Sequence, residues 1–293
     1  MWLTIAVIST LFIGVSTILS KIGIKDADAY VTGAVTNSVL LLAFVGTALF
    51  TGKFDQISDM GMWTWISIAA SGAVLSISWV FYFLGLKGGS VSVFLAIQSL
   101  TIVVSMVLCA VLIKEKITLF MIIGTVMIIT GTLLMMDREE LSALKNKKIW
   151  QSDQRWILFA AISAVLASVS YVIVKADKAP IDTNVTSTFR YIIVVVLLWI
   201  IFFSKKKQSS FKEIAPKCWL FILLGAAASG AGHVLVYKAL FLGKAAVIMT
   251  IYRMGMVISI ILSRIFLHEK LQKKGWFGFA LLVAGVVLFA VGR

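Results

Sequence analysis

Three ionisable side chains lie inside long apolar stretches of this sequence, and they are the residues best suited to binding a ligand. They are Arg190, His233 and Arg253. An ionisable group at membrane depth is costly and commonly marks a pathway or pocket, and arginine can hold a carboxylate or phosphate with two parallel hydrogen bonds. We therefore expect Arg253, and with it Arg190, to face an anionic group of a small molecule. Two structural alternatives stay open: Arg190 could extend toward the nearest loop, and His233 could bond a neighbouring helix.

Membrane helices are the elements that must position these side chains. Of the 293 residues, 60% are hydrophobic and only 14% are charged, and the mean hydropathy of +1.02 is far above that of an ordinary soluble domain. A helix crosses the hydrocarbon core with about 20 apolar residues, and runs such as IIVVVLLWIIFF are apolar on all sides, unlike the alternating strands of a membrane barrel. The sequence therefore predicts an all-α integral membrane protein, multi-pass in the cell membrane. The ten expected spans are residues 2–20, 30–50, 63–85, 91–113, 117–136, 156–174, 185–203, 218–237, 246–267 and 275–292.

The chain repeats itself at an offset of 154 positions. The aligned polar, tryptophan and glycine pairs carry more weight than apolar matches, which arise easily by chance. These pairs are Trp2–Trp156, Ser9–Ser163, Ser16–Ser170, Lys21–Lys175, Asp28–Asp182, Trp65–Trp219, Gly89–Gly243, Ser105–Ser259, Glu115–Glu269, Gly124–Gly278 and Gly131–Gly285. The offset divides the chain into two five-helix repeats, 1–137 and 156–293, joined by a polar linker loop, 138–155. Because five is odd, the second repeat must cross the membrane in the opposite sense, as in carriers whose substrate site lies between inverted halves that alternate access.

Unusual side chains occupy matching places in the two halves. At this offset the matches are Arg190 and Tyr191 with Thr36 and Asn37, His233 with Trp79, and Tyr252 and Arg253 with Gln98 and Ser99. Symmetric positions of inverted halves can converge on one central cavity. The second half supplies positive charge, whereas the first supplies amides that orient a ligand and an aromatic wall that contacts it. The expected substrate-binding residues are Arg253, Tyr252, Arg190, Tyr191, His233, Asn37, Trp79 and Gln98.

Each half also carries a glutamate just after its fourth span, Glu115 or Glu269, and two glycines seven residues apart in its fifth span. Two five-helix halves with these features resemble the EamA-type members of the drug/metabolite transporter superfamily. The resemblance implies a secondary transporter, working as an exporter or exchanger of a small metabolite, with a central cavity lined by the first four helices of each half. It does not name a substrate, because relatives handle amino acids, sugar phosphates, nucleotide sugars and other compounds.

Other functional classes fit these residues less well. All thirteen acidic residues lie at or near span ends or in loops, so the membrane-embedded glutamate through which small multidrug resistance relatives couple protons has no counterpart. An enzyme would need a catalytic constellation, yet the chain has two histidines, no HExxH motif and no glycine-rich phosphate loop. A channel usually builds its pore from several subunits. A flippase of a phosphate-bearing lipid and a multidrug efflux carrier on the same fold stay open as alternatives.

Two further features are expected to be structural. Glu115 and Glu269 each lie beside a lysine at a helix end, where local ion pairing or positioning of the tight loop is favoured over a role in transport. The two prolines, Pro180 and Pro216, lie in loops, so the spans are expected to be intact helices.

The expected partners are a small-molecule substrate and the lipid bilayer, with no cofactor, metal or nucleic acid. A coupling ion and the oligomeric state, for which a monomer would suffice, stay open. The net charge of +14 comes largely from lysines and arginines in short loops, where they meet anionic headgroups. Loops after the odd-numbered spans hold most of them, so the positive-inside rule places both termini outside, whereas the resemblance implies cytoplasmic termini. Both orientations are therefore retained.

Overall fold

The protein is an all-helical bundle. The computed structural model describes residues 2–145, 153–177, 179, 181–206, 208–242, 248, 251–252 and 254–292. The first half holds α1 (Trp2–Ile24), α2 (Ala29–Thr51), α3 (Met62–Gly88), α4 (Val91–Gln98), α5 (Leu100–Leu112) and α6 (Leu119–Met135). The second half holds α8 (Arg155–Ala176), α9 (Thr183–Ser204), α11 (Pro216–Leu242), α13 (Gly255–Phe266) and α14 (Lys273–Val291). Three short helices connect them: η1 (Lys53–Asp59), α7 (Arg138–Lys145) and α10 (Gln208–Glu213).

The prediction of an all-α membrane protein is confirmed. Within the described residues, eight helical segments are long and apolar enough to cross a membrane, one of them being α4 and α5 together, and α6 and α13 are shorter apolar helices. The buried core centres on α4, where every residue from Val91 to Ile97 is buried. The region expected to be a polar linker loop begins with the helix α7, whose first turn is closed by reciprocal bonds: the Asp137 carboxylate accepts from the Glu140 N–H, and the Glu140 carboxylate accepts from the Asp137 N–H, both at 2.9 Å.

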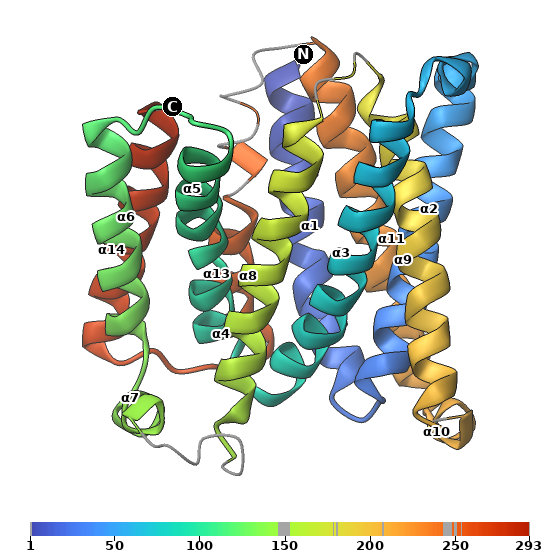
Figure 1. Ribbon diagram of the computed structural model, residues 1–293. Coiled ribbons are helices and arrows are strands. Elements are labelled where there is room, and N and C mark those ends of the chain that lie inside the picture. Colours follow the sequence, from blue (N-terminus) through green and yellow to red (C-terminus); the bar gives the residue numbers. More distant parts are fainter. Residues whose placement is uncertain are drawn as a thin grey trace.

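The two halves run through the bundle in opposite directions (Figure 1). Helix α1 begins at the end of the bundle where both chain termini and η1 lie, and α8 begins at the opposite end, where α7 and α10 lie. We call these the η1 end and the α7 end. An offset of 154 positions maps α1 onto α8 and α3 onto α11, and the packing follows the same rule, because α1 packs on α11 while α3 packs on α8.

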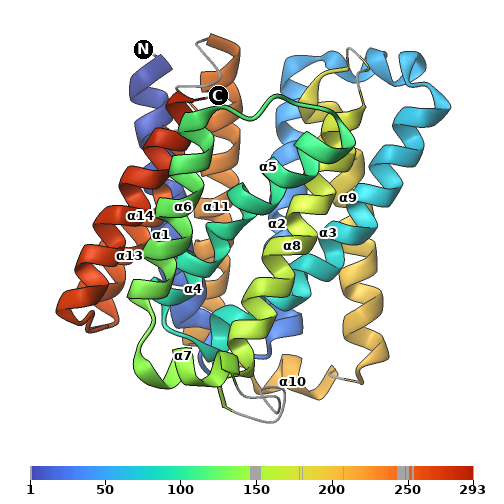
Figure 2. The same cartoon turned by 60° about the vertical axis from the view of Figure 1, so that its left-hand side comes forward.

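The glycine pairs mark where the last helices of the two halves cross. Helices α6 and α14 lie side by side at one edge of the bundle (Figure 1, Figure 2). A Cβ on Gly124 would lie 2.7 Å from the carbonyl oxygen of Gly285, and one on Gly131 would lie 2.6 Å from that of Gly278. Small residues let membrane helices approach backbone to backbone, so glycines seven residues apart, two turns along each helix, explain why the motif occurs twice.

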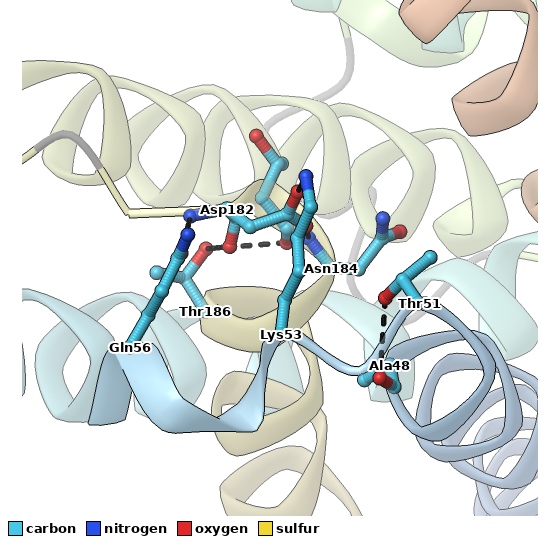
Figure 3. A network of polar contacts seen from close by, with 8 residues as sticks. Ala48, Thr51, Lys53, Gln56, Asp182, Asn184 and Thr186 are labelled. Carbon is cyan, nitrogen blue, oxygen red and sulfur yellow. Dashed lines mark hydrogen bonds and ion pairs between the residues drawn. The ribbon is translucent and has the colours of Figure 1, made fainter. Parts of the chain in front are cut away.

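A repeated aspartate starts the second helix of each half. Asp28 accepts a hydrogen bond from the Tyr30 N–H, and Asp182 accepts one from the Asn184 N–H, both at 2.8 Å. Asp182 also pairs with Lys53 of η1 at 2.5 Å, and its own N–H donates to the Gln56 side chain at 2.8 Å (Figure 3). Burial alone would raise the pKa of Asp182, but the bonds from Lys53 and Asn184 outweigh burial and hold that pKa below its usual range.

The expectation of intact spans is wrong for the fourth span. Helix α4 ends at Gln98 and α5 starts at Leu100, and the two lie end to end (Figure 2). The Ser99 hydroxyl donates to the Ala96 carbonyl at 2.6 Å, and the Ile102 N–H reaches the Ser99 carbonyl three residues back rather than four. The span is thus locally tightened to a three-residue hydrogen bond at Ser99, where the sequence has no proline. In the second half, α13 likewise starts only after a turn at Met254.

Candidate functional site

A histidine and a tyrosine from two spans of the second half are hydrogen-bonded to each other. The His233 Nδ1 lies 2.8 Å from the Ser229 carbonyl oxygen, and its Nε2 lies 3.1 Å from the Tyr252 hydroxyl. A carbonyl can only accept, so Nδ1 carries the hydrogen in that bond, and Nε2 of the neutral ring accepts from Tyr252. His233 therefore bonds its own helix through Nδ1 and Tyr252 of the next span through Nε2, and the second bond is of the kind that the structural alternative describes.

Phe44 of α2 connects this pair to the first half. Its ring lies edge-on to His233, with centroids 6.0 Å apart, and is tilted against Tyr191 at 4.8 Å. Trp79 of α3 packs on the buried cluster to which Phe44 and Tyr191 belong. Four of the expected residues, Tyr191, His233, Tyr252 and Trp79, thus gather around an aromatic cluster between the halves, and Phe44 is an addition that the sequence reading missed. Phe44 is an ordinary apolar residue of an apolar span, so nothing in the sequence distinguished it.

Three buried polar atoms beside this cluster have no hydrogen-bond partner among the described residues. They are the Thr36 hydroxyl oxygen, the Asn37 Oδ1 and the Trp79 Nε1. Asn37 is fully buried on α2, and its amide nitrogen donates to the Gly33 carbonyl at 2.9 Å. Buried polar groups are nearly always bonded in native proteins, so these atoms are candidates for contact with a polar ligand.

Gln98 lies elsewhere. Its amide nitrogen donates to the Ala160 carbonyl of α8 at 3.2 Å, so it joins α4 to the second half at the point where the fourth span is interrupted. No described contact connects Gln98 to the aromatic cluster. Arg253, the residue given most weight from the sequence, lies outside the described residues, and its role stays a prediction.

Arg190 lines a pocket at the η1 end. The pocket has a volume of about 140 Å³ and is bounded by the start of α3, the end of α8 and the start of α9. Asp177 lines the same pocket. The Arg190 guanidinium carbon lies 5.7 Å from the centroid of the Tyr191 ring, and the buried Nε has no partner among the described residues. Arg190 is half-buried, and its charged group lies near Tyr191 of the aromatic cluster, so the alternative that it extends toward the nearest loop stays open.

The repeated glutamates make contacts between distant parts of the chain rather than with the lysines beside them. At the α7 end, Glu269 accepts from the Val91 N–H at 2.6 Å, and from the N–H and hydroxyl of Ser92 at 3.1 and 2.8 Å. It therefore caps the N-terminus of α4 from the opposite half. At the η1 end, its counterpart Glu115 pairs with Lys175 of α8 at 2.6 Å. The prediction of a positioning role stands, and the partners come from the other half in both cases.

Lys21, on the last turn of α1, also binds the backbone at the α7 end. The Lys21 ammonium donates to the carbonyl oxygens of Leu86 and Gly89, both at 2.5 Å, and to that of Lys87 at 3.1 Å. It thus binds the C-terminus of α3, as a cation at a helix C-terminus does favourably. Lys21 and Glu269 together fix both sides of the short connection between α3 and α4.

The carboxyl group of Glu140 lies in a second pocket at the α7 end, of about 190 Å³, which also contains Glu269 and Lys274. Burial raises the pKa of Glu140 above its ordinary value.

Among the residues that the structure describes, no three His, Cys, Asp or Glu side chains gather closely enough to hold a metal ion.

Comparison with known proteins agrees with this architecture. The EamA-like transporter family matches residues 1–137 and 154–291. The "uncharacterized transporter in cobO 3'region" of Sinorhizobium sp is 30% identical over 138 residues, which make up 47% of this chain and 98% of that protein. A crystal structure of a protein superposes with a TM-score of 0.65 at 16% identity, covering 97% of this chain and 94% of that one, and so shares the fold. Because the family match spans nearly all of both halves, the chain belongs to the EamA-like transporter family and is a transporter rather than an enzyme.

Proposed function

We propose that this protein is a secondary transporter, an exporter or exchanger, that moves a small polar metabolite such as an amino acid or organic anion. Transport would proceed by alternating access between the halves 1–137 and 156–293, joined by the linker 138–155. The observation that carries the proposal is an asymmetry between the two ends of the bundle at positions that the repeat makes equivalent.

At the η1 end, Asp177 and Ile68 line an open pocket. Their counterparts at the α7 end, 154 positions away in each case, are Gly23 and Ile222. There a Cβ on Gly23 would lie 2.8 Å from the Ile222 side chain and 2.9 Å from its backbone nitrogen. The equivalent positions thus border a pocket at one end and are in direct contact at the other, a difference of the kind expected of one conformation of an inverted-repeat carrier.

The repeated lysine and glutamate also make different contacts at the two ends. At the α7 end, Lys21 and Glu269 hold the α3–α4 connection with six hydrogen bonds. At the η1 end, the counterparts Lys175 and Glu115 bond one another. In the opposite conformation, we expect Glu115 to cap the ninth span and Lys21 to pair with Glu269, because inverted halves exchange their arrangements.

The substrate site in this proposal lies at the aromatic cluster between the halves. Tyr252, held by His233, would contact the substrate through its ring and hydroxyl, and Asn37 would offer its unpaired oxygen to a donor. Arg253, next to Tyr252 in the sequence, is proposed to hold an anionic group. Tyr191 and Trp79 would supply apolar contacts, while Gln98 would act at the interrupted span rather than at the ligand.

Counterflow in proteoliposomes tests this function. Vesicles are loaded in turn with anionic, zwitterionic, neutral and cationic metabolites, and uptake of each labelled compound is compared between the unmodified protein and Arg253→Gln. Arg264→Gln is the matched control, because Arg264 is exposed and lies over the Trp276 ring at 5.1 Å. Uptake of an acid or zwitterion that Arg253→Gln abolishes and Arg264→Gln retains supports an anion-recognising carrier.

Other results in the same assay would redirect the proposal. Preference for neutral or cationic compounds, or uptake indifferent to Arg253→Gln, would remove the arginine from substrate recognition. Inhibition by prenyl or acyl phosphates but not by short-chain metabolites would indicate a lipid flippase on the same fold. Uptake of many unrelated hydrophobic cations would indicate a multidrug efflux carrier.

A further inference from the structure

The pocket at the η1 end carries a fixed negative charge. The Asp177 carboxylate accepts a hydrogen bond from the Ser67 hydroxyl of α3 at 3.0 Å and from the Ala179 N–H at 3.1 Å. These two donors come from opposite halves of the protein, so they set the position of the carboxylate relative to both walls of the pocket. Its remaining lone pairs can accept from a ligand.

The same pocket carries a fixed positive charge. Arg190 projects from the second turn of α9, and the α9 backbone there touches α3, because a Cβ on Gly72 would lie 3.0 Å from the Arg190 carbonyl oxygen. Among the described residues, the ion pairs are Lys53–Asp182 and Lys175–Glu115, so Arg190 and Asp177 do not neutralise each other by direct contact. The buried Arg190 Nε is also without a partner in that part of the chain.

Opposite charges that share a polar pocket without pairing match a ligand that carries both charges. We propose that this pocket binds a small zwitterion, with its carboxylate on Arg190 and its ammonium group on Asp177, before transfer to the site between the halves. Arginine binds a carboxylate with two parallel hydrogen bonds, and an ammonium group donates to a carboxylate. The hydroxyls of Thr186 and Ser187 line the wall between them. This inference rests on the proposed transport function and narrows its substrate class.

The size of the pocket limits the ligand. A volume of about 140 Å³ corresponds to on the order of five water-sized groups. An α-amino acid with a very small side chain has that many non-hydrogen atoms or one more, and carries its carboxylate and ammonium groups on the same carbon, Cα. Small α-amino acids are therefore the ligand class.

The position of Arg190 connects this pocket to the aromatic cluster. Its neighbour Tyr191 packs on Phe44, and the Phe44 ring lies edge-on to His233. The repeat gives no second copy of the pocket: the counterparts of Asp177 and Arg190 are Gly23 and Thr36, which carry no charge. A zwitterion would thus be captured from the η1 end only, which gives the carrier a preferred loading side.

Ligand binding to the purified full-length protein tests the inference. L-Alanine is compared with propionate, which lacks the ammonium group, and with isopropylamine, which lacks the carboxylate, by isothermal titration and ligand-induced thermal shift. We expect L-alanine to bind about tenfold or more tightly than either single-charge probe, because each lost charge-assisted contact is worth about that factor. Arg190→Gln should abolish the advantage over isopropylamine, and Asp177→Asn should abolish the advantage over propionate.

Matched controls keep the comparison on the pocket. Arg264→Gln removes an exposed arginine from α13, and Asp59→Asn removes an exposed aspartate at the η1 end; both should leave all three affinities unchanged. The thermal midpoint without ligand reports whether each variant is folded. The inference is overturned if L-alanine binds no more tightly than the two probes. It is equally overturned if folded Arg190→Gln and Asp177→Asn retain the binding pattern of the unmodified protein or weaken all three probes alike.

Failure of this inference can be told apart from failure of the transport function. Counterflow of any panel compound, without the charge-specific binding pattern, would leave a carrier whose η1-end pocket does not select zwitterions. The binding pattern without counterflow of any compound would leave the pocket standing and remove the carrier function.

Discussion

The repeat-related glutamates should differ sharply in their contribution to stability. Glu269→Gln and Glu115→Gln are the same change at equivalent positions, yet Glu269 accepts three hydrogen bonds at the start of α4, whereas Glu115 forms one partly exposed ion pair with Lys175. The comparison therefore isolates what the contacts at the α7 end contribute.

The magnitude follows from the bonds that each substitution loses. A glutamine at 269 keeps one carbonyl oxygen for the Val91 N–H but turns an NH₂ group toward the Ser92 N–H, which loses one charge-assisted bond and weakens the others. At about 1.5–3 kcal/mol for a hydrogen bond to a charged group, with about 0.3–1 kcal/mol from the helix N-terminus, we expect a loss of about 2–4 kcal/mol. At 115, where the carboxylate side chain is 38% exposed, we expect about 0.2–1 kcal/mol.

The assay is unfolding by SDS titration in mixed micelles, followed by far-UV circular dichroism and tryptophan fluorescence. Coincidence of the two signals justifies a two-state free energy. Equal losses in the two variants, or a larger loss for Glu115→Gln, would refute the reasoning that Glu269 is the more strongly bonded of the two glutamates in this conformation.

Three further outcomes follow from the structure. Gly131→Ala should lower the free energy of unfolding by about 1–3 kcal/mol, because its Cβ would meet a carbonyl oxygen at 2.6 Å, whereas Gly46→Ala, with nothing within 4 Å, should change it by no more than about 0.5 kcal/mol; SDS titration of both variants decides. The folded protein holds the pKa of Asp182 below its ordinary value. The ionised Asp182 therefore stabilises the folded state fully above the unfolded pKa of about 3.9, and this contribution is lost as the pH falls toward the folded pKa. The unmodified protein should lose more thermal stability between pH 6 and pH 3 than Asp182→Asn does. Tyr252→Phe removes the hydroxyl bonded to His233 and should raise the substrate concentration at half-maximal counterflow by about two- to tenfold. An unchanged concentration would place this pair outside the substrate path.

The sequence was sufficient where a residue acts on its own chain neighbours or through the repeat. The repeat identified Asp28 with Asp182 and Gly124 with Gly278, and in the structure each pair has matching roles, as helix caps and at the α6–α14 crossing. It was not sufficient where a role depends on which side of a helix faces inward. Phe44 looks like any lipid-facing phenylalanine until α2 is placed, so no sequence signal selected it.

Longer-range contacts were also beyond the sequence. Glu269 bonds Val91 and Ser92, which lie in the other half. The sequence suggested instead a pair with the adjacent Lys270. Gln98 had the right symmetry for the ligand site, but its amide donates to the Ala160 carbonyl, next to the interruption at Ser99. Such outcomes depend on the exact course of a span, which composition does not specify.

The crossing of α6 and α14 has a consequence for how such a chain can change over time. Its closest contacts join glycine backbone to glycine backbone, so this crossing depends on the absence of a side chain at four positions rather than on a specific pair of polar side chains. Each half is then free to accumulate differences elsewhere, such as Arg190 facing one pocket while its counterpart Thr36 stays buried and uncharged. The glycine crossing of α6 and α14 thus lets the two repeats stay associated while the rest of their sequences differ.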